Sequence, residues 1–376
     1  MSDQITNSPT EDGDLKRSLS NRHLQLIAIG GAIGTGLFMG SGKTISLAGP
    51  SILFIYMIIG LMVFLVMRAL GELLLSNLQY KSFIDFSTDL IGPWAGYFVG
   101  WTYWLCWITI GIADLSAIIY YLQFFNNGMP FTPLEGVLIS VASIIFITGL
   151  NLATVKLFGE MEFWFAMIKI IAIVVLIAVG AWMIFTGFTS TAGEVAAFSN
   201  LWSHGGMFPT GLGGFLAGFQ IAIFAFVGVE LVGTTAAETK DPEKNLPKAV
   251  NSIPIRIIIF YVLALVIVMA VTPWNKIDPS ISPFVNLFSQ AGIAAAAIIM
   301  NLVVLSSVMS SMNSGVFSTS RMLFGLSRDE QGPKSFGKLN KRAVPANALY
   351  FSTVCLLAGA ALQYFVPNTV DAFTLA

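Results

Sequence analysis

The chain has 376 residues, of which 56% are hydrophobic and only 10% are charged, and its formal net charge is −1. Soluble domains carry roughly 25% charged residues, so this composition excludes a soluble protein and predicts one that crosses the lipid bilayer many times. The near-neutral charge gives no support to a nucleic-acid partner. The two cysteines and two histidines show no metal-ligand spacing, so we expect neither a metal nor a redox site.

Residues 1–19 are polar and contain no apolar stretch that could serve as a signal peptide, so they are predicted to form a cytoplasmic tail. Nine apolar stretches follow, and each reaches or approaches the roughly 20 residues that span a bilayer. The predicted spans are Leu24–Leu47, Ser51–Ser76, Trp94–Phe125, Leu134–Asn151, Glu162–Thr186, Leu212–Ala236, Pro254–Trp274, Gly292–Leu326 and Ala346–Tyr364. Fifteen lysines and arginines lie at the predicted inner side, against two, Lys43 and Lys276, in outer loops. This bias predicts a cytoplasmic N-terminus.

Two of these spans contain glycines where a plain membrane helix would not. Residues 29–36 of the first span include four glycines, and each glycine in a helix interior costs roughly 1 kcal/mol relative to alanine. Glycines also flank Glu230 in the sixth span. One interpretation is close helix packing, because Gly30 and Gly34 have the small-xxx-small spacing. The other is a break in both helices, and their separation by five spans favours it, since a unit with an odd number of spans is inverted when repeated.

Ionisable residues inside the spans are the next candidates, because each costs about 2.5–3.5 kcal/mol at the bilayer centre. Lys169 lies in the middle of the fifth span and Glu230 at the proposed break of the sixth. Both are predicted to serve proton coupling, since burial disfavours the charged form of either group. Arg68 and Glu72 are spaced to neutralise each other on one helix, which explains them structurally. Asp114 in the third span is either a satisfied group inside the bundle or part of a substrate pocket.

Several motifs along the chain resemble those of one family. They are residues 34–38 (Gly-Thr-Gly-Leu-Phe), residues 67–73 (Met-Arg-Ala-Leu-Gly-Glu-Leu), residues 159–164 together with Lys169, and residues 237–249 after the sixth span. On these motifs the chain is similar to the amino acid permeases of the amino acid–polyamine–organocation superfamily, from about Leu19 to its last residue. The resemblance implies an all-α polytopic membrane protein with a five-plus-five inverted-repeat fold, in which the first and sixth spans are broken.

The resemblance also implies how the chain is divided. The first repeat, with spans one to five, is expected at residues 20–187, and an outer loop at residues 188–211. The second repeat is expected at residues 212–376, with spans six to nine and the start of span ten. The resemblance implies two further spans after the second repeat. The sequence stops at Ala376, just inside the expected span ten, so we expect the chain to be truncated there.

The same resemblance assigns roles at the two breaks. Backbone N–H groups of the first break would hold the α-carboxylate of a substrate, and carbonyl groups of both breaks would hold its α-ammonium. The implied substrate-binding residues are Ala32, Ile33, Gly34, Thr35, Gly36, Phe224, Ala225, Val227, Asn313 and Ser314, with Ser310 facing the same cavity. Lys169 resembles the lysine that replaces a sodium ion in proton-coupled relatives, and Glu230 matches an acidic position linked to proton coupling.

The function implied is import of small neutral amino acids by proton symport across the bacterial inner membrane. Glycine, D-serine and D-alanine are the expected substrates, and the proton is the coupling ion, with no cofactor. A sibling permease for proline or another neutral amino acid is the alternative. A membrane-embedded enzyme is disfavoured, because the spans show no nucleophile–base or metal-ligand spacing. A channel would differ from a carrier by steady flux without saturation.

Overall fold

The computed structural model describes residues 20–30, 33–77, 80, 82–191, 193–234, 239–292 and 294–366. Within these ranges the regular structure is mainly helical, and Thr189 and Val195 form an isolated β-bridge. Eight continuous helical stretches of the described chain are long and apolar enough to cross a membrane. The predicted all-α polytopic class is therefore confirmed.

Most of the long helices lie close to the predicted spans. In the described residues the α-helices are α1 Asn21–Gly30, α2 Ser41–Ala48, α3 Ile52–Ser76, α4 Phe83–Leu90, α5 Pro93–Gln123, α6 Pro133–Asn151, α7 Val155–Thr186, α8 Gly211–Ala222, α9 Leu231–Thr234, α10 Pro242–Asn251, α11 Ile253–Ile257, α12 Ala264–Val271, α13 Pro283–Gln290, α14 Ala294–Arg328 and α15 Ala346–Phe365. Two π-helical stretches, η1 Gly36–Gly40 and η7 Ile258–Leu263, and the 3-10 turn η5 Ile223–Phe226 join some of them.

Eight stretches stand where nine spans were predicted, because the first predicted span is not one helix. Its second half continues through a 3-10 turn at Gly49–Ser51 into α3, so that Gly36–Ser76 forms one stretch. Its first half, α1, is a separate helix of ten residues. A helix of that length is too short to cross the hydrocarbon core by itself.

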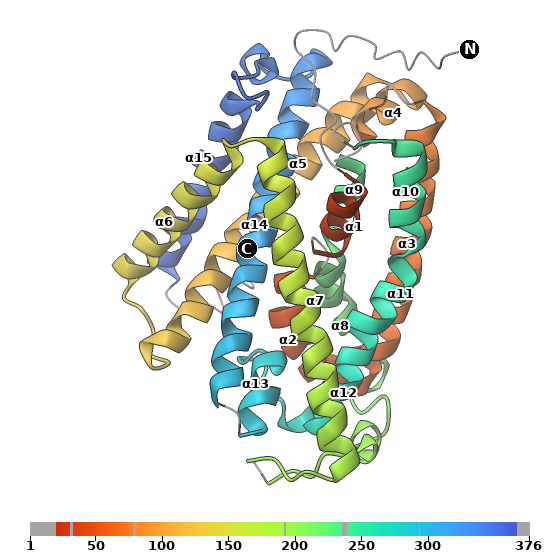
Figure 1. Ribbon diagram of the computed structural model, residues 1–376, viewed down its shortest axis with the longest axis vertical. Helices are drawn as coiled ribbons and strands as arrows, with labels where there is room; N and C mark the ends of the chain where they lie inside the picture. The colour runs from red at the N-terminus through yellow and green to blue at the C-terminus, as the bar shows by residue number, and fades with distance from the viewer. Residues whose placement is uncertain are drawn as a thin grey trace, which may run out of the picture.

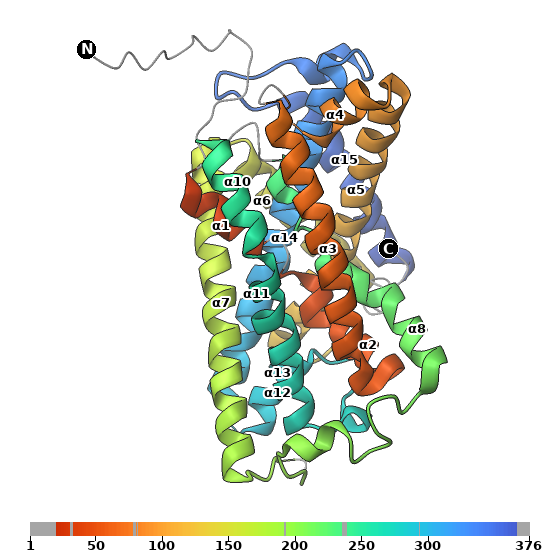
Figure 2. The ribbon, with the colours of Figure 1, turned by 90° about the vertical axis from the view of Figure 1, so that its right-hand side faces the viewer.

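The helices form an elongated bundle (Figures 1 and 2). Helices α7 and α14 run through most of its height, and α6 lies beside α15 on one flank (Figure 1). On another flank the column of α10, α11 and α12 runs beside α3 (Figure 2). Helices α5 and α14 pack closely at Gly315, where a Cβ added to the glycine would stand 2.5 Å from the ring of Trp107. Such close helix packing through a small residue is typical of membrane bundles.

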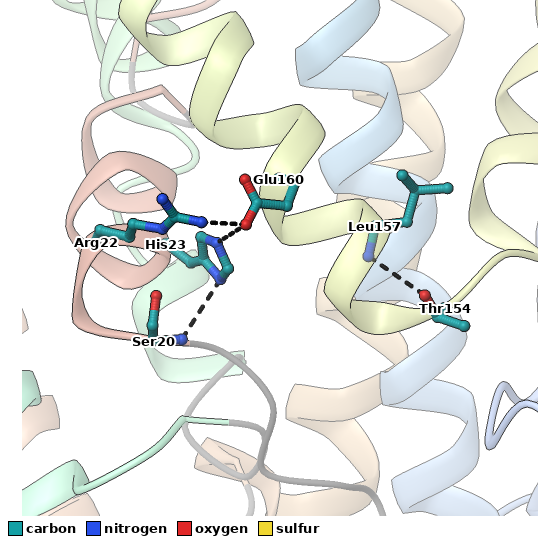
Figure 3. Close-up of polar contacts among 6 residues, drawn as sticks. All are labelled: Ser20, Arg22, His23, Thr154, Leu157 and Glu160. Carbon is teal, nitrogen blue, oxygen red and sulfur yellow. Dashed lines mark hydrogen bonds and ion pairs between the residues drawn. The ribbon is translucent and has the colours of Figure 1, made fainter.

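Helix α7 begins earlier than the predicted Glu162, and its start is capped. The Thr154 hydroxyl accepts a hydrogen bond from the Leu157 N–H, so the helix starts at Val155. Glu160 therefore lies on this helix and faces α1, where it contacts Arg22 and His23 (Figure 3). These contacts fasten the N-terminal half of the first span to α7.

Candidate substrate site

The first predicted break is present in the structure. Helix α1 ends at Gly30, Ile33 and Gly34 are not helical, and the chain turns again only from Thr35 into the π-helical stretch η1. Side chains from distant helices bind the backbone here, since the Ser307 hydroxyl donates to the Ile33 carbonyl at 2.8 Å. Ala32 lies outside the described residues. Irregular backbone at membrane depth is tolerated only where protein or water hydrogen-bonds its free N–H and C=O groups. Ser307 provides such a hydrogen bond to the Ile33 carbonyl.

The second predicted break is present in the sixth span. Helix α8 gives way to the 3-10 turn η5, after which Val227 is extended and Gly228 has a φ of 103°. Such a positive φ favours glycine over any other residue. Helix α9 then starts at Leu231. The carbonyl of Ala225 accepts a hydrogen bond from the Tyr261 hydroxyl at 3.0 Å, so here too a side chain from another element satisfies the freed backbone.

The two breaks meet backbone to backbone at Gly36. A Cβ added at Gly36 would lie 2.6 Å from the Cα and the backbone N of Ala225, and 2.7 Å from the carbonyl carbon of Phe224. Real Cβ atoms do not approach backbone atoms this closely, and backbone atoms cannot rotate aside. Only glycine permits this approach, so the glycine pattern in the first span marks the point at which the two breaks touch.

A cavity of about 500 Å³ lies beside this contact. It is bordered by the C-terminal half of the first span, α5 and the sixth span, and its lining residues are Met39, Gly40, Lys43, Leu47, Cys106, Thr109, Ile110, Ala113, Gln220, Ile221, Phe224, Val227 and Pro279. Of the predicted site residues, Phe224 and Val227 line it. Small-molecule sites are typically concave, mostly apolar and of this size, with a few polar groups that fix the ligand.

Asp114 of α5 lies against the first break. Its Oδ1 accepts a hydrogen bond from the Thr35 hydroxyl, and both side chains are buried. Its second oxygen, Oδ2, has no hydrogen-bond partner within the described chain. The contact with Thr35 places the Asp114 carboxylate beside the first break.

Lys169 belongs to a buried polar network that reaches across three helices. Its Nζ donates to the Ser310 hydroxyl at 3.1 Å, and that hydroxyl donates to Oε2 of Glu162 at 2.7 Å. Asn313 donates to the other oxygen of Glu162 at 2.7 Å and accepts from Asn151 at 2.8 Å. Asn313 is thus committed to other side chains, with its amide directed at Glu162.

The remaining predicted residues are placed as follows. Ser314 is buried one position beyond Asn313, and its hydroxyl has no hydrogen-bond partner among the described residues. Glu230 sits in the second break and is half-buried. Its carboxylate accepts from the Tyr103 hydroxyl at 3.0 Å and from the N–H of Gly228 at 2.9 Å. Glu230 therefore ties the second break to α5.

Sequence reasoning missed Glu162 as a site residue. It stands seven residues before Lys169, about two helical turns away, which is too far for a direct ion pair on one helix. The structure joins the two groups through Ser310 of α14. The signal for Glu162 was present in the motif at residues 159–164, which holds a glutamate at a predicted membrane boundary.

Comparison with known proteins shows the family of the chain. The family model described as "Amino acid permease" matches residues 23–376. The D-serine/D-alanine/glycine transporter of Escherichia coli K12 is 64% identical over 368 residues, which cover 98% of this chain and 77% of that protein. The Amino-acid permease AapA of Bacillus subtilis 168 is 54% identical over 361 residues, covering 96% and 76% of the two chains. The prediction of a transporter and not an enzyme is confirmed, and the chain belongs to the amino acid permease family.

Proposed function

We propose that this permease imports small neutral amino acids, with glycine, D-serine and D-alanine as substrates, by symport with one proton. The observation that carries the proposal is the contact of two interrupted helices at Gly36 and Ala225 beside a cavity of about 500 Å³. Interrupted helices at membrane depth present free N–H groups and carbonyls, which suit the two charges of a zwitterion. The name of the Escherichia coli relative supports the choice of substrates.

The proposed architecture is a pair of inverted repeats, with the first at residues 20–187, an outer loop at residues 188–211 and the second at residues 212–376. Its support is that the two interruptions lie five predicted spans apart. We also propose that the protein resides in the bacterial inner membrane with its N-terminus in the cytoplasm. The excess of lysine and arginine in the predicted inner loops supports this orientation.

In the proposed site, the N–H groups of Gly34, Thr35 and Gly36 hold the α-carboxylate of the substrate. Carbonyl groups from both breaks, including those of Ile33 and Ala225, hold its α-ammonium. Each of these two carbonyls already accepts one hydrogen bond, from Ser307 and from Tyr261. A carbonyl oxygen has two lone pairs, so one acceptor direction remains at each for the ammonium.

The residues proposed around this core set the substrate class and the coupling. Carbonyls of Ala32, Phe224 and Val227 complete the ammonium site, and Asn313 and Ser314 of α14 border it. Lys169 stands where a sodium-coupled relative would hold its ion, and Glu230 supports the coupling from the second break. The cavity wall beside Phe224 and Val227 is mostly apolar, which suits a short uncharged side chain.

Substrate competition tests this proposal most simply. Uptake of radiolabelled glycine is measured in proteoliposomes that contain the purified protein, with each competitor in large excess. We expect D-serine and D-alanine to block uptake and lysine and glutamate to leave it unchanged, because a charged side chain would be desolvated in a mostly apolar cavity. Stronger inhibition by proline than by D-alanine would favour the sibling permease. Glycine flux that rises linearly without saturation would overturn the carrier and favour a channel.

A further inference from the structure

Glu162 is a buried carboxylate whose surroundings are built around it. Its side chain is 1% exposed, and both of its oxygens accept hydrogen bonds from α14, one from Ser310 and one from Asn313. An ionised carboxylate in the membrane interior costs several kcal/mol unless it is paired and hydrogen-bonded. This arrangement exceeds what is needed to pack α7 against α14, where an apolar residue would serve.

Among the described residues, one charged side chain acts on Glu162. Lys169, on the same helix, is the ionisable group whose field acts on the Glu162 carboxylate. Glu160, two residues earlier, is directed at Arg22 and His23 of α1. The sequences of α12 and α13, which also pack against α7, contain no ionisable residue.

The elements that face Glu162 from the other side hold their charges further away. Helix α14 contributes Ser310 and Asn313, and its Arg321 lies over the ring of Phe317, 3.5 Å from its centroid. Helix α6 contributes the neutral Asn151. On α5, Asp114 acts electrostatically on Lys169. Lys169 thus interacts electrostatically with both Glu162 and Asp114.

The hydrogen bonds between Lys169 and Glu162 run in one direction. The Lys169 ammonium donates to the Ser310 oxygen at 3.1 Å, and the Ser310 hydroxyl donates to Glu162 at 2.7 Å. A hydroxyl that accepts from an acid and donates to a base can pass a proton. The N–H bond of Lys169 breaks as its proton binds Ser310 Oγ, while the original hydroxyl proton of Ser310 binds Glu162 Oε2. The products are a neutral amine, a hydroxyl and a carboxylic acid, so atoms and charge balance.

We propose that Glu162 is the group that exchanges a proton with Lys169, through the hydroxyl of Ser310, during the transport cycle. The inference rests on the proposed proton symport and names the group that takes the proton from Lys169. The exchange removes two buried charges at once. It thereby changes the field that Lys169 exerts on Asp114, whose carboxylate binds Thr35 at the first break. The protonation state of the network is in this way connected to the substrate site.

The test compares Glu162→Gln with the wild type in proteoliposomes, by three readouts. We expect the affinity for glycine to change by less than about threefold, because Glu162 does not line the cavity. Exchange of internal for external glycine, which requires no net proton movement, is expected to persist. With one coupled proton, a membrane potential of about 100 mV supports roughly fifty-fold accumulation of glycine in the wild type. Glu162→Gln is expected to show no accumulation. Glu72→Gln, which removes an exposed carboxylate paired with Arg68, is the matched control and should behave as the wild type.

Ser310 provides the second arm of the test. Ser310→Ala removes the hydroxyl and is expected to abolish accumulation as Glu162→Gln does, whereas Ser310→Thr keeps a hydroxyl and should restore it. If Glu162→Gln does not fold, the comparison of Ser310→Ala with Ser310→Thr decides whether the proton passes through this hydroxyl. A merely structural role for Glu162 would lower exchange and accumulation together, and that result would overturn the inference. Normal accumulation by Glu162→Gln would also overturn it while leaving the proposed symport intact. Absence of proton-driven accumulation in the wild type would overturn both.

Discussion

Gly36→Ala is expected to weaken glycine binding strongly while the protein still inserts and folds. The added Cβ would stand 2.6 Å from the backbone of Ala225, and no side-chain rotation can relieve the clash. Overpacking of a tight contact costs about 1–3 kcal/mol, which corresponds to a loss of affinity of up to roughly a hundredfold if the breaks separate. The measurement is equilibrium binding of radiolabelled glycine to the purified protein, with size-exclusion chromatography as the check on folding.

Gly42→Ala is the matched control for this experiment. Gly42 lies on α2, six residues further on, and its added Cβ would have its nearest neighbour at 3.4 Å, an ordinary contact distance. We expect this variant to bind glycine as the wild type does.

Gly34→Val should behave like Gly36→Ala, because a β-branched side chain resists the non-helical backbone and fills the space proposed for the carboxylate. Normal binding by Gly36→Ala would remove the two-break contact from the substrate site.

Lys169→Arg is expected to keep substrate binding and to lose proton-driven accumulation. Lys169 is fully buried, and its ammonium donates to Ser310 in the network that holds Glu162. Arginine keeps the positive charge but does not deprotonate in proteins, so it cannot take part in a proton exchange. Accumulation of glycine under a membrane potential of about 100 mV should fall from roughly fifty-fold to none, whereas glycine exchange should persist.

The control for this substitution is Lys276→Arg, since Lys276 is an exposed lysine that lies near Glu194. It should accumulate glycine as the wild type does. A purely structural pairing of Lys169 predicts a different pattern, in which arginine satisfies the same neighbours and accumulation survives. That pattern in Lys169→Arg would remove the lysine from the coupling mechanism.

The membrane class and the breaks could be predicted from the sequence because both depend on local composition. The glycines of residues 29–36 report a backbone that leaves the helix, and the structure has its irregular segment there. Short helices in the loops were not predicted, although α4 has a readable signal. Ser82 and Asp85 form a capping box at its start, with the Ser82 side chain bound to the Ile84 N–H and Asp85 bound to the Ser82 N–H.

The partners of the site residues could not be predicted, because they depend on which helices pack together. Ser307 and Ile33 are 274 residues apart, and Lys169 and Ser310 are 141 apart. No local pattern indicates which hydroxyl will meet which carbonyl. The same holds for Asp114, for which the sequence left two interpretations open. Its contact with Thr35 arises only when α5 packs against the first break.

Sodium-free accumulation of glycine tests the central claim most directly. Proteoliposomes that contain the purified protein are given an inward proton gradient and an interior-negative potential of about 100 mV, with no sodium on either side. A zwitterion that enters with one proton carries one positive charge, and the potential alone supports roughly fifty-fold accumulation. The account predicts accumulation of at least this order, because the proton gradient adds to the potential, and the accumulation should collapse when a protonophore is added. A strict requirement for sodium, with no accumulation in its absence, would contradict it.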